Sequence, residues 1–205
     1  EKSADETNVK YLGQAINHQY SKTFRFESDF RDYVDKFLTQ DVSYFSLLRP
    51  LYEIQIAKLF SQNPEDVTKF TSCNHYKSSG RWCGECPKCL SIYLLLAPFT
   101  EVTSMIQIFG ANLLEKETLI PLYASMVDPT KTKPFECIAT YAESQVASFL
   151  LMKKILKSGS KLPVLLDYFK LHIFPKHQEW DTRTDALLHQ FDERNFLPKD
   201  LKDAV

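Results

Sequence analysis

Four of the five cysteines lie within one stretch of seventeen residues, at Cys73, Cys83, Cys86 and Cys89. Two overlapping C-x-x-C steps bring neighbouring thiolates toward one ion, and Gly84 lets the backbone turn between them. Cys73 would complete a tetrahedral shell from across a loop. Because four thiolates leave no open coordination position, we expect a structural zinc ion. Any chemistry must then come from residues beside the metal.

Other uses of these cysteines remain open. Disulfide bonds are disfavoured by the lack of a recognisable signal peptide and by the odd number of cysteines. An iron–sulfur cluster would use the same four thiolates, and the spacing does not exclude it. His75 could replace one cysteine as a ligand. The fifth cysteine, Cys137, is expected to be a small buried side chain rather than a nucleophile.

The composition is that of a globular chain with a large core. The chain has 205 residues, of which 44% are hydrophobic and 13% aromatic, and its formal net charge is -1. This balance does not suggest a nucleic-acid-binding protein. The longest apolar run, 90–99, is interrupted by Pro98 and falls short of the roughly 20 residues of a membrane span. We expect a cytoplasmic protein without nucleic-acid or membrane partners.

The sequence lacks the usual phosphate-binding loops. It contains only five glycines and neither a G-x-x-x-x-G-K-[ST] nor a G-x-G-x-x-G motif. Any nucleotide site would therefore be incomplete or supplied from elsewhere. Because the chain begins with Glu1 rather than methionine, we expect a fragment or one domain of a larger protein.

Hydrophobic periodicity predicts a mainly α-helical domain around the cysteine loop. Ser28 is the expected cap of the first helix, and Pro50 is expected at the first position of the second. Phe24 and Phe26 alternate as in a half-buried strand or turn. Helices are expected at residues 28–39, 50–62, 87–97, 101–109, 115–126, 142–157, 162–172 and 181–191, an extended or loop segment at 67–72, and a short strand near 42–45.

The predicted domain organisation has three parts. Residues 1–14 form a flexible N-terminal segment, residues 15–195 form a single helical domain around the cysteine loop, and residues 196–205 form a C-terminal tail. The sequence contains no internal repeats or low-complexity tracts.

Polar side chains are dense just before the first expected helix. Asn17, His18, Tyr20 and Lys22 place an amide, an imidazole, a phenol and an ammonium group within six residues. Such a run suits a ligand-binding loop, and an exposed polar connection is the alternative.

Two further groups of polar residues suggest ligand contacts. Arg49 precedes a helix and Glu53 lies in its first turn, so the two either contact an anionic substrate or form a capping and ion pair. Residues of the cysteine loop beside Trp82 suit phosphate or carboxylate binding, with solvated charge as the alternative. They are Asn74, Lys77, Arg81 and Lys88.

Several spaced motifs together resemble a known enzyme family. In chain order they are residues 17–22, 44–57, 81–89, 108–114 and 133–137. Over about residues 15–150 the sequence resembles the C-terminal half of the ATP-dependent UDP-N-acetylmuramoyl-L-alanyl-L-glutamate epimerases. These bacterial enzymes invert the terminal L-glutamate of a peptidoglycan precursor to D-glutamate, using ATP and magnesium.

The resemblance implies a mechanism and roles for individual residues. Adenylation of the glutamate α-carboxyl acidifies the α-hydrogen, which is removed and replaced from the opposite face before hydrolysis releases AMP. The implied acid–base candidates are His18, Tyr20, Glu53 and Glu136. The implied substrate- or ATP-binding residues are Asn17, Lys22, Arg49, Asn74 and Arg81.

The cysteine loop also resembles the zinc loop of the 7-cyano-7-deazaguanine synthases. These enzymes belong to the ATP pyrophosphatase group, which implies a relation to a Rossmann-like architecture. The spacing between the first two cysteines differs from theirs, and the Ser-Gly-Gly-x-Asp-Ser loop of that group is absent. A missing N-terminal region would then hold the ATP phosphates, and this chain alone need not be active.

Two other classes of function fit the same residues. One is a zinc-stabilised module that binds a ligand or a partner without turnover. The other is a different ligase or amidotransferase of the ATP pyrophosphatase type, which would leave the glutamate stereocentre unchanged.

Overall fold

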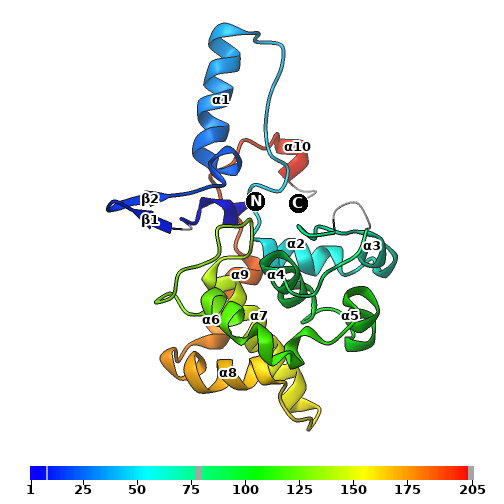
Figure 1. Ribbon diagram of the computed structural model, residues 1–205. Helices are drawn as coiled ribbons and strands as arrows, with labels where there is room; N and C mark the ends of the chain where they lie inside the picture. The colour runs from blue at the N-terminus through cyan, green and yellow to red at the C-terminus, as the bar shows by residue number, and fades with distance from the viewer. Residues whose placement is uncertain (8, 77–79, 203–205) are drawn as a thin grey trace.

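The computed structural model describes residues 1–7, 9–76 and 80–202. Lys77, one of the expected cationic residues of the cysteine loop, lies outside the described residues. The described part of the chain is mainly helical, as predicted, and contains one two-stranded sheet. Figure 1 shows helices α2 to α9 gathered into a body from which α1 projects.

The helices and strands have the following bounds. The α-helices are α1 (Phe24–Phe37), α2 (Glu53–Phe60), α3 (Pro64–Lys69), α4 (Pro87–Leu96), α5 (Val102–Phe109), α6 (Ile120–Val127), α7 (Tyr141–Lys157), α8 (Val164–His172), α9 (Trp180–His189) and α10 (Lys199–Lys202). The strands are β1 (Val9–Tyr11) and β2 (Gln14–Ile16), and the 3-10 turns are η1 (Lys2–Asp5), η2 (Tyr20–Lys22), η3 (Leu113–Glu115), η4 (Glu117–Leu119) and η5 (Phe174–Lys176).

Helix α4 lies at the centre of the core. Its side chains are buried around most of its circumference, since Leu90, Leu94, Leu95 and Leu96 are each at most 2% exposed. A helix that is apolar on all sides is stable only when other elements surround it. Helices α2 and α7 pack on α4, and α6, α8 and α9 pack on α7. The cysteine loop leads directly into this central helix.

A buried carboxylate joins the N-terminal segment to the core. Glu143 forms a capping box with Thr140 at the start of α7. Its carboxylate also accepts hydrogen bonds from the Ser3 hydroxyl at 2.8 Å and the Ile54 amide at 3.0 Å. Ser3 and Ala4 are buried, so part of the segment expected to be flexible packs on the body. The proposed domain limits at residues 14 and 195 stay predictions.

The first helix begins earlier than predicted. The Thr23 hydroxyl accepts a hydrogen bond from the Phe26 amide at 3.2 Å, and this contact makes Thr23, rather than Ser28, the N-cap. Phe24 and Phe26 therefore belong to α1, and the strand or turn expected there was wrong. The second helix begins at Glu53 rather than Pro50, because Tyr52 is extended and its amide donates to the Gln55 side chain.

Other local predictions also need correction. No strand forms at 42–45; this segment lies against α1, where Arg31 donates to the Tyr44 carbonyl and Phe30 packs edge-on against the Tyr44 ring. The loop expected from residue 67 is partly helical, because Pro64 starts α3. The expected helix at 115–126 begins as two 3-10 turns and becomes α-helical at Ile120.

The β1–β2 hairpin was not predicted. Its strands are antiparallel and only three residues long, with Val9 opposite Ile16. Leu12 and Gly13 form the turn with positive φ angles of 49° and 77°, which is the backbone twist that tight hairpins favour. A leucine at the first of these positions is not a typical residue for such a turn, so the sequence did not indicate a hairpin here.

Candidate active site beside a four-cysteine cluster

The four cysteine sulfurs converge as the sequence predicts. Cys73, Cys83, Cys86 and Cys89 have their sulfur atoms within 4.8 Å of one another, with Cys83–Cys89 and Cys86–Cys89 separations of 3.6 and 3.4 Å. Four sulfurs bound at about 2.3 Å to a tetrahedral zinc ion would lie about 3.8 Å apart. The cluster is therefore close to the size of a four-thiolate metal site. His75 is not part of this group of convergent ligand atoms.

The backbone of the cysteine loop donates hydrogen bonds to the cysteine sulfurs. Main-chain amides of Cys83, Cys86 and Cys89 donate to cluster sulfurs at 3.3–3.4 Å. Burial alone would raise the pKa of Cys73, but amide hydrogen bonds, among them one from Cys83, outweigh it and lower this pKa to about 6. Burial raises the pKa of Cys86 and Cys89. A bound cation would favour their deprotonated forms.

Gly84 is required by the packing of the loop. Its φ is +67°, and a Cβ placed there would lie 3.1 Å from the Leu113 side chain. A larger residue would meet both the backbone strain of a positive φ and this contact. The loop therefore depends on glycine between the first two cysteines of the C-x-x-C steps.

The segment 135–137 lies against the cysteine loop. The Asn74 side-chain amide donates to the Glu136 carboxylate at 2.7 Å, and the Lys88 ammonium donates to the Cys137 carbonyl at 2.6 Å. Asn74 follows one metal-site cysteine and Lys88 precedes another. The four-cysteine cluster thus positions Asn74 and Lys88, whose side chains hold segment 135–137.

On its other side the segment contacts the N-terminal polar run. The Cys137 sulfur lies 3.4 Å from His18 Nε2 and 3.6 Å from Lys22 Nζ. The Phe135 ring packs on the imidazole with a centroid distance of 4.6 Å. Burial and, next, the Lys22 charge lower the pKa of His18, which favours a neutral imidazole at pH 7. Cys137 therefore forms one polar cluster with His18 and Lys22, which lie more than 100 positions away in the sequence.

Glu53 is a buried carboxyl beside Lys88. Its Oε1 lies 4.0 Å from Lys88 Nζ, while its Oε2 is buried without a hydrogen-bond partner among the described residues. Burial raises the pKa of Glu53 to about 7, although the Lys88 charge opposes the shift. A carboxyl with such a pKa can donate or accept a proton near neutral pH.

Replacing Glu53 by glutamine is expected to stabilise the chain at high pH. The pKa of Glu53 is raised in the folded state. The contribution of the Glu53 carboxyl to the free energy of unfolding is therefore fully present below about pH 4.5, where the carboxyl is protonated. This contribution is lost as the pH rises through about 7 and the buried carboxyl ionises. We expect Glu53→Gln to be about 1–3 kcal/mol more stable than the wild type at pH 8, with little difference at pH 5. Urea unfolding at both pH values measures this.

The matched control is Glu65→Gln, which changes an exposed carboxylate paired with Lys69. This variant should show nearly the same difference from the wild type at both pH values. If Glu53→Gln were instead less stable than the wild type at pH 8, the ion pair with Lys88 would outweigh the burial of the charge.

The remaining predicted site residues do not join the cluster by any described contact. Asn17 donates to the Ala4 carbonyl and accepts from the Gln19 amide, so it fixes a turn. The Tyr20 hydroxyl donates to Asp29 at 3.0 Å. Arg81 is exposed on the cysteine loop. The predicted roles of these three residues remain untested.

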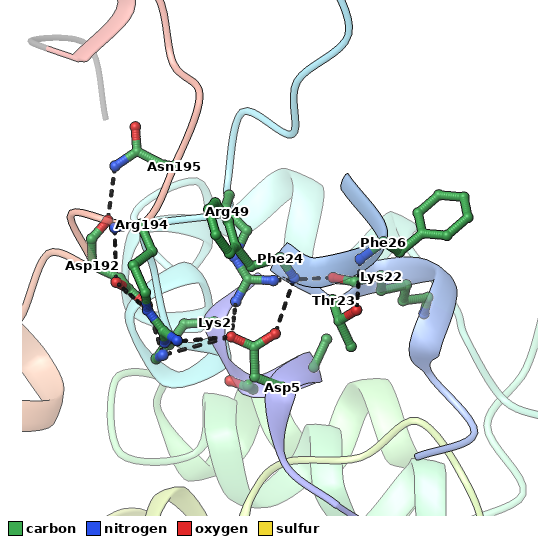
Figure 2. Close-up of polar contacts among 12 residues, drawn as sticks. Lys2, Asp5, Lys22, Thr23, Phe24, Phe26, Arg49, Asp192, Arg194 and Asn195 are labelled. Atoms are coloured by element: carbon green, nitrogen blue, oxygen red, sulfur yellow. Dashed lines mark hydrogen bonds and ion pairs between the residues drawn. The ribbon is translucent and has the colours of Figure 1, made fainter. Parts of the chain in front are cut away.

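Arg49 lies in an internal network that Figure 2 shows. Its side chain is fully buried and donates to the Lys22 carbonyl at 3.1 Å and to the Asp5 carboxylate at 3.0 Å. Lys2 and Arg194 also approach Asp5, each at 3.6 Å. This burial favours a structural role for Arg49 over the predicted contact with an anionic substrate.

The structure places Cys137 in surroundings that the sequence did not predict. The residue was expected to be a small buried side chain rather than a nucleophile, but it is only partly buried and contacts His18 and Lys22. The available signal was its position in 133–137, the last of the motifs that carry the family resemblance.

Within the described residues, no helix is both long and apolar enough to cross a membrane. The fold and the site define a helical domain in which a four-cysteine cluster able to hold a metal ion adjoins a cluster formed by His18, Lys22 and Cys137.

Comparisons with known proteins identify the family. The family model described as the MurL C-terminal domain matches residues 69–170, and the model described as the MurL N-terminal domain matches residues 1–47. The chain therefore belongs to the MurL family. The matches begin before and extend beyond the region 15–150 in which the motifs were recognised. No solved structure matches the chain.

Two curated relatives carry the same name, UDP-N-acetyl-alpha-D-muramoyl-L-alanyl-L-glutamate epimerase. The protein from Xanthomonas oryzae pv. oryzae is 40% identical over 145 residues, which cover 68% of this chain and 32% of the relative. The protein from Micromonospora sp. is 40% identical over 158 residues, which cover 75% of this chain and 35% of the relative. The matched region thus spans about a third of the length of these relatives. The relation to the ATP pyrophosphatase group and to a Rossmann-like core stays a prediction.

Proposed function

We propose that the full-length protein containing this chain inverts the terminal L-glutamate of UDP-N-acetylmuramoyl-L-alanyl-L-glutamate to D-glutamate, in the synthesis of a peptidoglycan precursor. The observation that carries this proposal is the 40% identity to relatives named as epimerases for this substrate. The cluster around Cys137 supports it, because inversion of a carbon centre requires groups that remove and return a proton.

The proposed reaction uses ATP and magnesium. The α-hydrogen beside a free carboxylate is only weakly acidic, and adenylation of that carboxyl removes its negative charge and makes the hydrogen easier to abstract. Hydrolysis of the adenylate then releases AMP. This chain has no glycine-rich phosphate loop, so we assign the binding of the ATP phosphates mainly to the N-terminal region of the full-length protein.

Residues of the cluster have distinct roles in this proposal. The carboxyl of Glu53 is the candidate acid–base group, because its pKa of about 7 suits proton transfer near neutral pH. The ammonium groups of Lys22 and Lys88 would stabilise negative charge that develops on the substrate. Glu136, which accepts a hydrogen bond from Asn74, is a second candidate for the acid–base group.

We assign a zinc ion to the four cysteines. Four thiolate ligands favour zinc in a closed, structural site. The metal would hold the loop that presents Asn74 and Lys88 to residues 136 and 137. Its contribution would then be to position side chains rather than to contact the substrate.

The direct test incubates the full-length protein with ATP, magnesium and the nucleotide-linked L-glutamate substrate. Acid hydrolysis and chiral chromatography should reveal D-glutamate, and AMP should appear with it. No D-glutamate should form when ATP is omitted.

The other outcomes assign the protein differently. AMP without inversion would indicate another adenylating reaction on a carboxylate. The absence of both products would favour a metal-stabilised module that binds a ligand or a partner.

A further inference from the structure

We propose that the Cys137 thiol exchanges a proton with the α-carbon of the glutamate on one face, with His18 and Lys22 as its partners. This inference rests on the proposed epimerase function and adds a catalytic residue to it. It is carried by the contacts of the thiol.

The geometry around the sulfur is that of a thiol paired with a base. His18 Nε2 lies 3.4 Å from the Cys137 sulfur, within the range in which a thiol and an imidazole share a proton. Lys22 Nζ lies 3.6 Å from the same atom and supplies a positive charge beside it. An activated thiol requires an adjacent base or cation, and Cys137 has both.

Three further contacts hold this arrangement in place. The main chain of Cys137 is held by Lys88, and Asn74 holds the preceding Glu136. Phe135 packs on the imidazole of His18. The thiol and its base are therefore both oriented by neighbours on the cysteine loop and on segment 135–137. Such support is what a catalytic group needs to keep a productive orientation.

Access to the thiol is also preserved. Cys137 is partly exposed, and Lys22 is exposed. The other cysteines lie in the metal cluster. A purely structural cysteine would instead be enclosed by apolar side chains and would not contact an imidazole and an ammonium group.

The proton balance of the step is closed. The imidazole of His18 takes the thiol proton, and the Cys137 thiolate then removes the α-proton from the adenylated glutamate, which leaves an enolate beside the positive charge of Lys22. A second acid on the opposite face, for which Glu53 is the candidate, protonates the enolate. The imidazolium returns its proton to solvent and Glu53 takes one up, so no proton is gained or lost over the cycle.

The first test separates inversion from adenylation in the full-length protein. Cys137→Ala is expected to lower the rate of D-glutamate formation by about 100- to 10,000-fold, the usual contribution of a general acid or base. AMP formation should stay within about threefold of the wild type, because adenylation does not use the thiol. The control is Thr132→Ala, an exposed residue five positions before Cys137, which should leave both rates unchanged.

The second test does not depend on turnover. Iodoacetamide should alkylate Cys137 of the metal-loaded full-length protein, and the labelled peptide can be quantified by mass spectrometry. The intact substrate should slow this labelling at least about tenfold, since the reacting glutamate would cover the thiol. UDP-N-acetylmuramoyl-L-alanine, which lacks the glutamate, should give little protection.

Each contrary outcome has a distinct meaning. If the wild type makes no D-glutamate, the epimerase proposal fails and the role of the thiol fails with it. If the wild type inverts glutamate but Cys137→Ala keeps more than about a third of that rate, only the thiol proposal is overturned. Equal loss of AMP and D-glutamate in Cys137→Ala, or protection by both nucleotides alike, would assign Cys137 to structure or general binding.

Discussion

Replacement of Cys89 by serine, or removal of the metal by a chelator, is expected to lower the melting temperature of the chain by about 10 °C or more. Cys89 is fully buried and lies in the first turn of α4, the helix at the centre of the core. A structural metal site contributes directly to folding. A loss of about 3–5 kcal/mol shifts the melting temperature of a chain of this size by roughly 10–15 °C. Calorimetry with and without chelator, together with metal analysis, measures the effect.

The matched control is the same chemical change outside the four-cysteine cluster, Cys137→Ser. This variant should retain one metal ion per chain and melt within about 3 °C of the wild type, because its side chain is only partly buried. Equal melting temperatures for the wild type and Cys89→Ser, with no metal bound by either, would show that the converging sulfurs do not need an ion. Iron rather than zinc in the metal analysis would replace the proposed metal while keeping the structural role.

The features that sequence predicted well are those encoded locally. The spacing places all four clustered cysteines within one loop, so the convergence of their sulfurs needs no knowledge of distant contacts. The central helix predicted at 87–97 is observed as Pro87–Leu96, and the one predicted at 142–157 as Tyr141–Lys157. Proline at the start of the first and a capping box at the start of the second mark these boundaries in the sequence.

The cluster of His18, Lys22 and Cys137 could not be predicted from local patterns. His18 and Cys137 are separated by 119 positions, and nothing in either neighbourhood indicates that their side chains meet. Helix periodicity gives the face of an element but not its partner across the fold. The family resemblance selected both motifs without showing that they are adjacent, and the fold supplied that information.

The same limitation explains the prediction for Arg49. A basic residue before a helix is compatible with binding an anion and with an internal ion pair, and the choice depends on what surrounds it. Its partner, Asp5, lies 44 positions away in a segment that appeared to be a polar chain end. The packing of this segment on the body decides the role of the arginine.

Arg49→Met is accordingly expected to destabilise the chain by about 2–4 kcal/mol. The guanidinium is fully buried, and its loss removes one donor from the Asp5 carboxylate and one from the Lys22 carbonyl. Removing one partner of a buried ion pair typically costs about 3–5 kcal/mol. We expect a somewhat smaller loss than this range, because Asp5 keeps the amide of Phe24 as a donor. Urea unfolding of the purified chain gives the difference directly.

Arg25→Met makes the same chemical change at an exposed ion pair and is the matched control. The side chains of Arg25 and Asp29 are 82% and 62% exposed, so this variant should lose no more than about 1 kcal/mol. A contrast between the two variants would establish Arg49 as a structural residue that also fixes the main chain of Lys22 beside the Cys137 thiol. If Arg49→Met were as stable as Arg25→Met while the full-length variant bound substrate more weakly, Arg49 would have the anion-binding role predicted from sequence, which would require the Asp5 contact to open when substrate binds.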